Sequence, residues 1–424
     1  MNNKIIIFVA LLATILAGVS PAMGQKTGLV TDTVMMNPGY STEVYYNMAS
    51  GTKASVLRNQ WDIAFRTAIR SASIITNDGS GVVLYTYPKS DTSGWASVDT
   101  AGFKTWKPLY NSLTDREMGS FNTYSKGEFD YGWGVYNIVT HNLTGDSLYL
   151  VKLRNGLFCK LQIVTKASAL NKYHIKYAAL DGTGEQNVTI DCASHTAKNF
   201  IGYSFPDNQV VDFETADAST WDLLFTKYMG LSGTTPYPVT GVLSNYNTGV
   251  VNYHPVPLDF RAWDASLMDS SRSAIGYNWK YIDASYVYHI VDSSVYFVQD
   301  KGGNIYKLIF KEFAGSTTGR IVLQKEMISA AGINEFEKSD LNAAIYPNPV
   351  NGVMNLVINP GASNSAFVSL HDLAGRSVFG KSFELQSEIL STLQIPVEGI
   401  SPGIYVVSIQ AGKNTINRKV IIKN

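Results

Sequence analysis

Short runs in which apolar and polar residues alternate dominate the chain beyond its N-terminal segment. In residues 147–153 (SLYLVKL) the apolar positions Tyr149, Val151 and Leu153 share one face, and residues 159–163 resume the alternation after a turn. Asn155-Gly156 lies between the two runs, and both residue types tolerate the positive φ of a type I′ hairpin turn. No long stretch has a convincing helical period. The pattern therefore predicts an all-β protein whose helices are few and short.

The alternating pattern occurs twice along the chain, as two similar segments. Residues 59–65 (NQWDIAF) return at 219–225 as STWDLLF, and GVV at 81–83 returns as GVL at 241–243. Three further blocks follow in the same order: FKTW at 103–106 with FRAW at 260–263, Trp133 with Trp279, and residues 149–161 with 296–308. Five ordered blocks indicate a duplicated module, and a period this long means two domains rather than a solenoid.

The repeated Trp-Asp pair has two interpretations. Trp61 and Trp221 each stand between apolar positions, which favours core packing, although an indole could also form a wall for a flat ligand. The adjacent Asp62 and Asp222 point the other way along the strand, where we expect them to accept hydrogen bonds from backbone donors or water. The nearby TNDGSG at 76–81 predicts a turn rather than a Ca²⁺ loop, because it lacks regularly spaced carboxylates.

The two ends of the chain differ from the modules. Residues 1–24 combine Lys4, a long apolar stretch and Ala22-Met23-Gly24, which predicts a signal peptide cleaved before Gln25. The apolar stretch of this segment is shorter than a bilayer span, so we do not expect it to stay as a membrane anchor. We therefore expect no integral membrane segment in the mature chain. Residues 328–341 are polar and predict a linker. Residues 342–424 return to short strands with Gly and Pro between them, typical of a small β-sandwich.

Composition narrows the possible functions. The 34 Lys and Arg balance the 34 Asp and Glu, and charged residues make up only 16% of the chain, so we expect no nucleic-acid partner. The chain shows no H-E-x-x-H, G-x-S-x-G or Walker A motif, which favours a non-enzymatic protein. The two cysteines, Cys159 and Cys192, suit either one disulfide in an oxidising compartment or two small buried side chains.

The C-terminal region resembles the type A sorting domain of the type IX secretion system. The matching motifs are YPNPVNG at 346–352, LHDLAGR at 370–376, SPGIYVVSI at 401–409 and the ending RKVIIKN. The resemblance covers 342–424 and implies passage across the outer membrane of a Gram-negative cell by the type IX machinery. It also implies a secreted or cell-surface product, usually after removal of this domain.

The duplicated modules resemble the HmuY family of haem-binding surface proteins. The resemblance rests on both Trp-Asp blocks, on TNDGSG, on IGYNWKYID at 275–283 and on residues 295–323, and it covers about 31–180 and 197–327. It implies two tandem antiparallel β domains, at 25–190 and 191–327, with haem held between strands by two axial side chains. The implied partners are haem or a related porphyrin, or host proteins that carry haem.

The axial residues depart from the pair of histidines found in the founding members of that family. Around Trp133 the candidates are Met118 and His141, and around Trp279 they are Met268 and His289. Methionine sulfur and histidine nitrogen are valid axial ligands of haem iron. His289 alternates with Val287, however, and this favours an ordinary strand residue. The sequence thus predicts an exported surface protein that binds haem for iron acquisition. The alternative is a structural or adhesive surface protein whose modules have lost haem.

Overall fold

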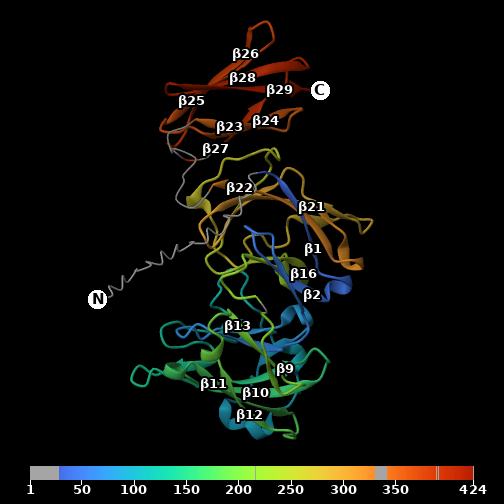
Figure 1. Ribbon diagram of the computed structural model, residues 1–424, viewed down its shortest axis with the longest axis vertical. Coiled ribbons are helices and arrows are strands. Elements are labelled where there is room, and N and C mark those ends of the chain that lie inside the picture. The colour runs from blue at the N-terminus through green and yellow to red at the C-terminus, as the bar shows by residue number, and fades with distance from the viewer. Residues whose placement is uncertain (1–27, 215, 330–340, 388, 390, 424) are drawn as a thin grey trace, which may run out of the picture.

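The protein is built almost entirely from antiparallel β-sheets, as the sequence predicts. The computed structural model describes residues 28–214, 216–329, 341–387, 389 and 391–423; the expected signal peptide lies outside these ranges, as does most of the expected linker. Three bodies follow one another along the long axis (Figure 1). We call them unit A, unit B and the C-terminal sandwich.

Unit A consists of two sheets that enclose one core. The smaller sheet runs in the order β14 (Gln209–Val211), β13 (Phe200–Ser204), β4 (Ile63–Arg66) and β5 (Ile74–Thr76). The larger contains β6 (Val83–Thr86), β7 (Gly134–Tyr136), β8 (Leu143–Gly145), β9 (Leu148–Lys152), β10 (Phe158–Ala167), β11 (Lys172–Ala179) and β12 (Gln186–Asp191). Apolar residues from both sheets, among them Phe65, Leu161 and Ile201, form a single buried cluster.

Unit B repeats this plan. Its first sheet runs in the order β16 (Thr235–Ser244), β15 (Leu223–Ser232), β2 (Thr42–Tyr46) and β3 (Lys53–Leu57). The second runs β1 (Val30–Met35), β22 (Arg320–Ser329), β21 (Ile305–Phe313), β20 (Val295–Gln299) and β17 (Gly249–Tyr253), beside a hairpin of β18 (Lys280–Ile282) and β19 (Tyr288–Ile290). Val44, Phe225 and Leu323 lie in its core.

The two sequence repeats exchange their first three strands. The first repeat supplies β1 to β11 and the second supplies β12 to β22, yet β1 pairs with β22 and β2 pairs with β15. Conversely, β13 of the second repeat pairs with β4 of the first. The expected consecutive domains, 25–190 and 191–327, are therefore not the folded units. Unit A is one continuous segment, whereas unit B joins the N-terminal strands to the second half of the chain.

The Trp-Asp pairs hold the exchanged strands. The Asp62 carboxylate accepts a hydrogen bond from the Phe205 backbone N–H at 2.9 Å, and Arg154 Nε lies 3.0 Å from it. At the equivalent place in unit B, Asp222 accepts from the Met48 N–H at 2.7 Å. Phe205 directly follows β13 and Met48 closely follows β2, so each aspartate binds the strand that arrives from the other repeat. The expectation that these aspartates accept backbone donors is confirmed.

The β9–β10 hairpin forms as predicted, with Tyr149 opposite Leu161. In its turn only Gly156 has a positive φ, 84°, so the turn is not of type I′. The helical segments of the described residues are short 3-10 turns: η1 (Pro38–Tyr40), η2 (Asp78–Ser80), η3 (Thr92–Ser97), η4 (Phe103–Thr105), η5 (Ser120–Asn122), η6 (Ser168–Leu170), η7 (Ala193–His195), η8 (Ala265–Leu267) and η9 (Gly315–Thr317).

The two cysteines are free and buried. Cys159 pairs with Ala179 at one end of the β10–β11 ladder, whereas the Cys192 N–H donates to the Asn171 carbonyl at the other end. With a rise of about 3.3 Å per residue, the length of β10 keeps the two sulfur atoms more than roughly 20 Å apart. A disulfide is therefore geometrically impossible, and the alternative of two buried side chains holds.

The C-terminal sandwich packs one three-stranded sheet on one four-stranded sheet. The first runs β23 (Asn342–Tyr346), β24 (Val353–Asn359) and β27 (Ser391–Pro396), and the second β26 (Ser377–Glu384), β25 (Ser365–His371), β28 (Gly403–Ala411) and β29 (Asn414–Ile422). Leu356, Leu370 and Val407 belong to its own core. Tyr346 and Val357 also cluster with Phe260 of unit B, so the sandwich packs directly against that unit.

Candidate functional site

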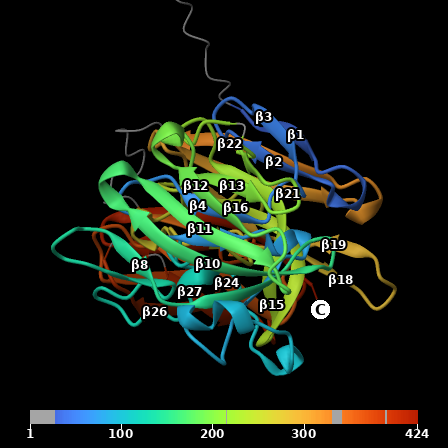
Figure 2. The ribbon, with the colours of Figure 1, turned by 90° about the horizontal axis from the view of Figure 1, so that it is seen from below.

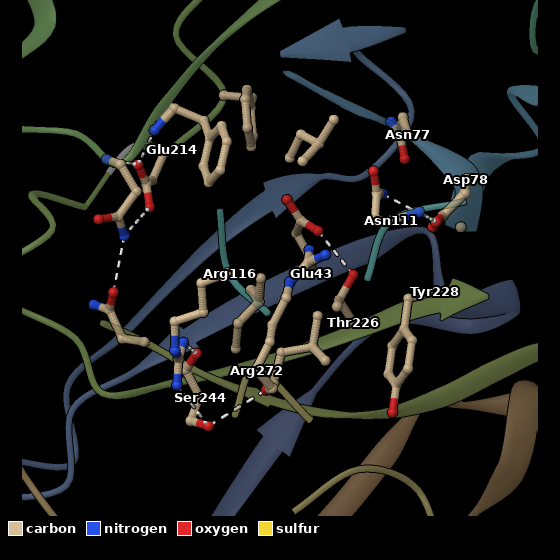
Figure 3. A pocket seen from close by; sticks show the side chains of 18 of the residues that line it. Glu43, Asn77, Asp78, Asn111, Arg116, Glu214, Thr226, Tyr228, Ser244 and Arg272 are labelled. Atoms are coloured by element: carbon tan, nitrogen blue, oxygen red, sulfur yellow. Dashed lines mark hydrogen bonds between the residues drawn. The ribbon is translucent and has the colours of Figure 1, made fainter. Parts of the chain in front are cut away.

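A cavity of about 80 Å³, lined by charged, polar and aromatic residues, lies where unit A meets unit B (Figure 3). Its lining comes from both repeats and both units. The residues that matter for its chemistry are Glu43, Trp61, Asp78, Arg116, Glu214, Trp221, Tyr228 and Arg272. Only Asp78 and the two tryptophans belong to motifs that the sequence had singled out. The other residues carry no sequence signal, because they become neighbours only when strands are exchanged and the two units pack together.

The η2 turn joins the two units beside the cavity. A Cβ on Gly79 would stand 1.7 Å from the carbonyl oxygen of Lys227 on β15, so only glycine permits this approach. The adjacent Asp78 accepts a hydrogen bond from the Met229 N–H across the interface at 3.3 Å, and from Asn111 Nδ2 at 3.0 Å. The TNDGSG motif is thus a turn, as predicted, and it also forms part of the contact between units.

Three buried carboxyl groups face this region. Glu43 accepts hydrogen bonds from the hydroxyls of Thr226, at 2.8 Å, and Tyr45, at 3.2 Å. Glu214 accepts from the Phe200 N–H at 3.1 Å and from Asn199 Nδ2 at 3.0 Å. Burial raises the pKa of all three: Glu214 to about 7, Asp78 to about 6, and Glu43 upward as well. The negative charge of the cavity is therefore weaker than its composition suggests.

Two arginines balance these carboxyls in different ways. Arg116 reaches from a loop of unit A into unit B, where its guanidinium donates to the carbonyls of Ser244, Ser270 and Ser271. Burial lowers the pKa of Arg116 to about 10. Arg272 extends toward Glu43 at the centre of the cavity (Figure 3). Among the described residues its guanidinium finds no hydrogen-bond acceptor, although it interacts electrostatically with Glu43 and Asp78.

Trp61 and Trp221 combine the two interpretations of the sequence. Each is 6% exposed, and each packs in a small apolar cluster, Trp61 stacked on Phe213 at 4.4 Å and Trp221 edge-on to Tyr45 at 5.0 Å. Both also line the cavity. Both are therefore core residues, and one edge of each indole forms part of the cavity wall.

Met118 and His141, the expected axial pair of the first module, lie in different surroundings. Met118 lines the cavity between the units. His141 is exposed in the turn between β7 and β8, where its Nδ1 lies 2.5 Å from the Tyr136 hydroxyl. No contact or cavity in the described part of the chain brings the two side chains together.

Met268 and His289, the expected pair of the second module, are also apart. Met268 is partly buried against the apolar cluster that contains Val251 and Phe260. His289 lies on β19, donates from Nε2 to Asp283 at 2.8 Å, and stacks on the ring of Tyr281 at 5.2 Å. Within the described residues nothing connects the methionine to the histidine. The placement of His289 in a strand is as predicted.

The two histidines nevertheless share a distinctive setting, because each belongs to an exposed apolar hairpin. Val139 in the β7–β8 hairpin is 83% exposed, and Tyr286 in the β18–β19 hairpin is 85% exposed. Trp133 and Trp279 precede these hairpins and are buried at 0% and 1%, so they anchor the hairpins in the cores. Seen along the long axis, β8 and the β18–β19 hairpin lie on opposite sides of the molecule (Figure 2).

The described residues show neither a metal site nor a membrane-spanning helix. No group of three or more His, Cys, Asp or Glu side chains there is arranged to hold a metal ion. None of the described helical segments has the length and apolar character needed to cross a bilayer.

The C-terminal sandwich is the part of the chain whose family is recognisable. Residues 344–423 match the family model described as secretion system C-terminal sorting domain, which confirms the expectation for 342–424. The chain is therefore a client of the type IX secretion machinery, and it is secreted or displayed on the surface of a Gram-negative bacterium of the Bacteroidetes type. No curated protein matches the chain.

Three solved structures with low similarity accompany this match. Apo PinO from Porphyromonas gingivitis is 10% identical with a TM-score of 0.29, over 72% of this chain and 100% of PinO. Dimeric latent PorU from Porphyromonas gingivalis is 11% identical with a TM-score of 0.23, over 92% of this chain and 34% of PorU. PorZ, a surface component of the type-IX secretion system of the same species, is 9% identical with a TM-score of 0.16, over 75% and 50%. TM-scores this low establish no shared fold.

Proposed function

We propose that this exported protein is a non-enzymatic surface binding protein whose binding elements are the β7–β8 and β18–β19 hairpins. The observation that carries the proposal is the combination, in both repeats, of exposed apolar side chains with one histidine held by a neighbouring side chain. Exposed aromatic and aliphatic residues gathered at one place mark ligand or partner sites. Haem for iron acquisition is the ligand that the sequence resemblance implies.

The hydrogen bonds of the two histidines support haem as the ligand. His289 donates Nε2–H to Asp283, and His141 uses Nδ1 toward Tyr136. Metal-bound histidines usually bond their second ring nitrogen to a carboxylate or another polar group, which fixes the ring and its tautomer. In both hairpins one ring nitrogen is left for iron. Because the hairpins lie on opposite sides of the molecule, we propose two separate sites, each with one protein ligand.

Haemin titration of the mature full-length chain tests the proposal. We expect a Soret band that shifts from that of free haemin and saturates near two equivalents. His141→Ala and His289→Ala should each remove one equivalent, whereas His254→Ala, an exposed histidine outside the hairpins, should leave both. Met118→Ala should also have no effect, because Met118 lies in the interior cavity. A spectrum identical to that of free haemin would refute haem binding.

The second candidate is a structural or adhesive surface protein. It is favoured by the separation of each methionine from its histidine, since the family-implied pair of axial ligands does not assemble in either unit. The same two hairpins would then contact another macromolecule through their apolar tips. Replacing Val139 and Tyr286 by serine should weaken attachment of the protein to cells while haemin spectra stay those of the free compound.

A further inference from the structure

The cavity between the units is a separate feature from the hairpins and calls for a different ligand. Ligand pockets for drug-sized molecules have volumes of roughly 300 to 1,000 Å³, so a cavity of about 80 Å³ holds only a molecule with few heavy atoms. A porphyrin does not fit. The walls combine aromatic faces with a few charged groups, which is the usual make-up of a small-molecule site.

The charged groups of the cavity differ in how well they are already satisfied. Each of Glu43, Asp78 and Glu214 accepts at least two hydrogen bonds from protein donors. The Arg116 guanidinium is occupied by three backbone carbonyls. Of the two guanidinium groups, that of Arg272 donates no hydrogen bond to a described residue, whereas that of Arg116 donates to these three carbonyls. A guanidinium carries five N–H donors in a planar fork that matches a carboxylate.

We propose that the cavity between unit A and unit B binds a small carboxylate, with the carboxylate group on the Arg272 guanidinium and the remainder of the molecule against Trp61 and Trp221. The paired geometry of guanidinium and carboxylate gives two parallel hydrogen bonds. Burial favours the neutral forms of Glu43, Asp78 and Glu214, so these groups repel an anion less than ionised carboxylates would. The occupant would contact strands of both repeats and stabilise the junction of the units.

The test uses the full mature chain and small probes that differ in charge. Sodium acetate, sodium propionate and glycine are titrated by calorimetry, with acetamide as the neutral analogue of acetate and chloride added to equal ionic strength. Acetate and propionate represent simple acids, and glycine represents the amino acids, so the three distinguish the two sources of a carboxylate. Intrinsic tryptophan fluorescence is recorded in parallel, because Trp61 and Trp221 line the cavity.

We expect at least one carboxylate probe to bind and to change the tryptophan emission, while acetamide does neither. Arg272→Gln should weaken that binding at least tenfold, and Arg261→Gln, an exposed arginine paired with Glu326, should not change it. Trp221→Phe, which keeps an aromatic wall, should weaken binding less. If Arg272→Gln does not fold, the proposal is tested by the difference between acetate and acetamide binding to the wild-type chain. Failure of all three carboxylates, or equal effects of acetate and acetamide, would overturn the proposal and leave a water-filled cavity.

The outcome is independent of haem. The proposed haem sites use His141 and His289 on the surface hairpins and involve no residue of the cavity lining. A chain that fails to bind haemin can therefore still bind a carboxylate, and the reverse also holds.

Discussion

Asp62 should be one of the most sensitive positions of unit A, because it holds a strand that the second repeat supplies. The side chain is 0% exposed, and it contacts the Phe205 N–H at 2.9 Å and Arg154 Nε at 3.0 Å. Asp62→Ala leaves the buried Phe205 N–H without its acceptor and removes the buried acidic partner of Arg154, whose guanidinium keeps only the Ser204 hydroxyl and the exposed Asp207. Removing one partner of such a buried charge pair costs about 3 to 5 kcal/mol. For a unit of this size that corresponds to a fall in melting temperature of roughly 10 °C.

Arg154 offers a matched control for this prediction, because it has a second acidic neighbour. Asp207 lies 3.8 Å from Arg154, and its side chain is 55% exposed. Asp207→Ala should therefore change stability by less than about 1 kcal/mol, as expected for an exposed ion pair. Differential scanning calorimetry of both variants and the wild type measures the difference. If Asp62→Ala melts no earlier than Asp207→Ala, the strand-holding role of Asp62 is refuted.

Three further predictions concern the interface and the cores. Gly79→Ala should destabilise the protein by about 2 kcal/mol or more, because its Cβ would meet the Lys227 carbonyl, whereas Gly28→Ala, which has open space, should be neutral in the same melting assay. The folded-state pKa of Glu214, about 7, lies above its ordinary value near 4.5, so the folded state binds more protons between these values. The stabilisation that Glu214 gains from this proton is present in full below about pH 4.5 and is lost as the pH rises through 7. It amounts to roughly 3 kcal/mol at most. Glu214→Gln should flatten the dependence of the melting temperature on pH. Thiol titration in denaturant should find two free thiols per chain, and a reductant should leave the melting temperature unchanged, since Cys159 and Cys192 cannot pair.

Local features of the fold could be predicted because they depend on residues close in sequence. Alternation along residues 147–163 gave the β9–β10 hairpin with Tyr149 opposite Leu161, and Gly156 marked its turn. The equivalent β20–β21 hairpin follows from the second copy of the same pattern. The exchange of strands could not be predicted in this way. All five residues of β2 are buried, and the local sequence pattern carries no information on whether β2 pairs with β4 or with β15.

The site residues were missed for the same reason. Glu43 stands on β2, Arg272 follows the short η8 turn, and Glu214 follows β14, so no sequence spacing relates them. Haem chemistry pointed to histidine and methionine near Trp133 and Trp279. However, Met118 lines the cavity and Met268 packs on an apolar cluster, whereas both histidines lie on surface hairpins. No sequence motif marks a buried carboxyl or guanidinium group that lies beside a tryptophan. It becomes visible only when the strands of both repeats are assembled.

The exchange also determines how binding by a single repeat can be studied. A cut between the repeats, near residue 190, would leave unit A without β13 and unit B without β2, and would open both cores. Val44 and Tyr46 of β2 are almost fully buried in unit B, and Ile201 and Tyr203 of β13 are equally buried in unit A. Burial of each such side chain contributes about 1.5 to 3 kcal/mol, so neither isolated repeat should fold. Unit A alone, residues 58–214, keeps all its strands, and it is the fragment in which the β7–β8 hairpin can be separated from its counterpart in unit B.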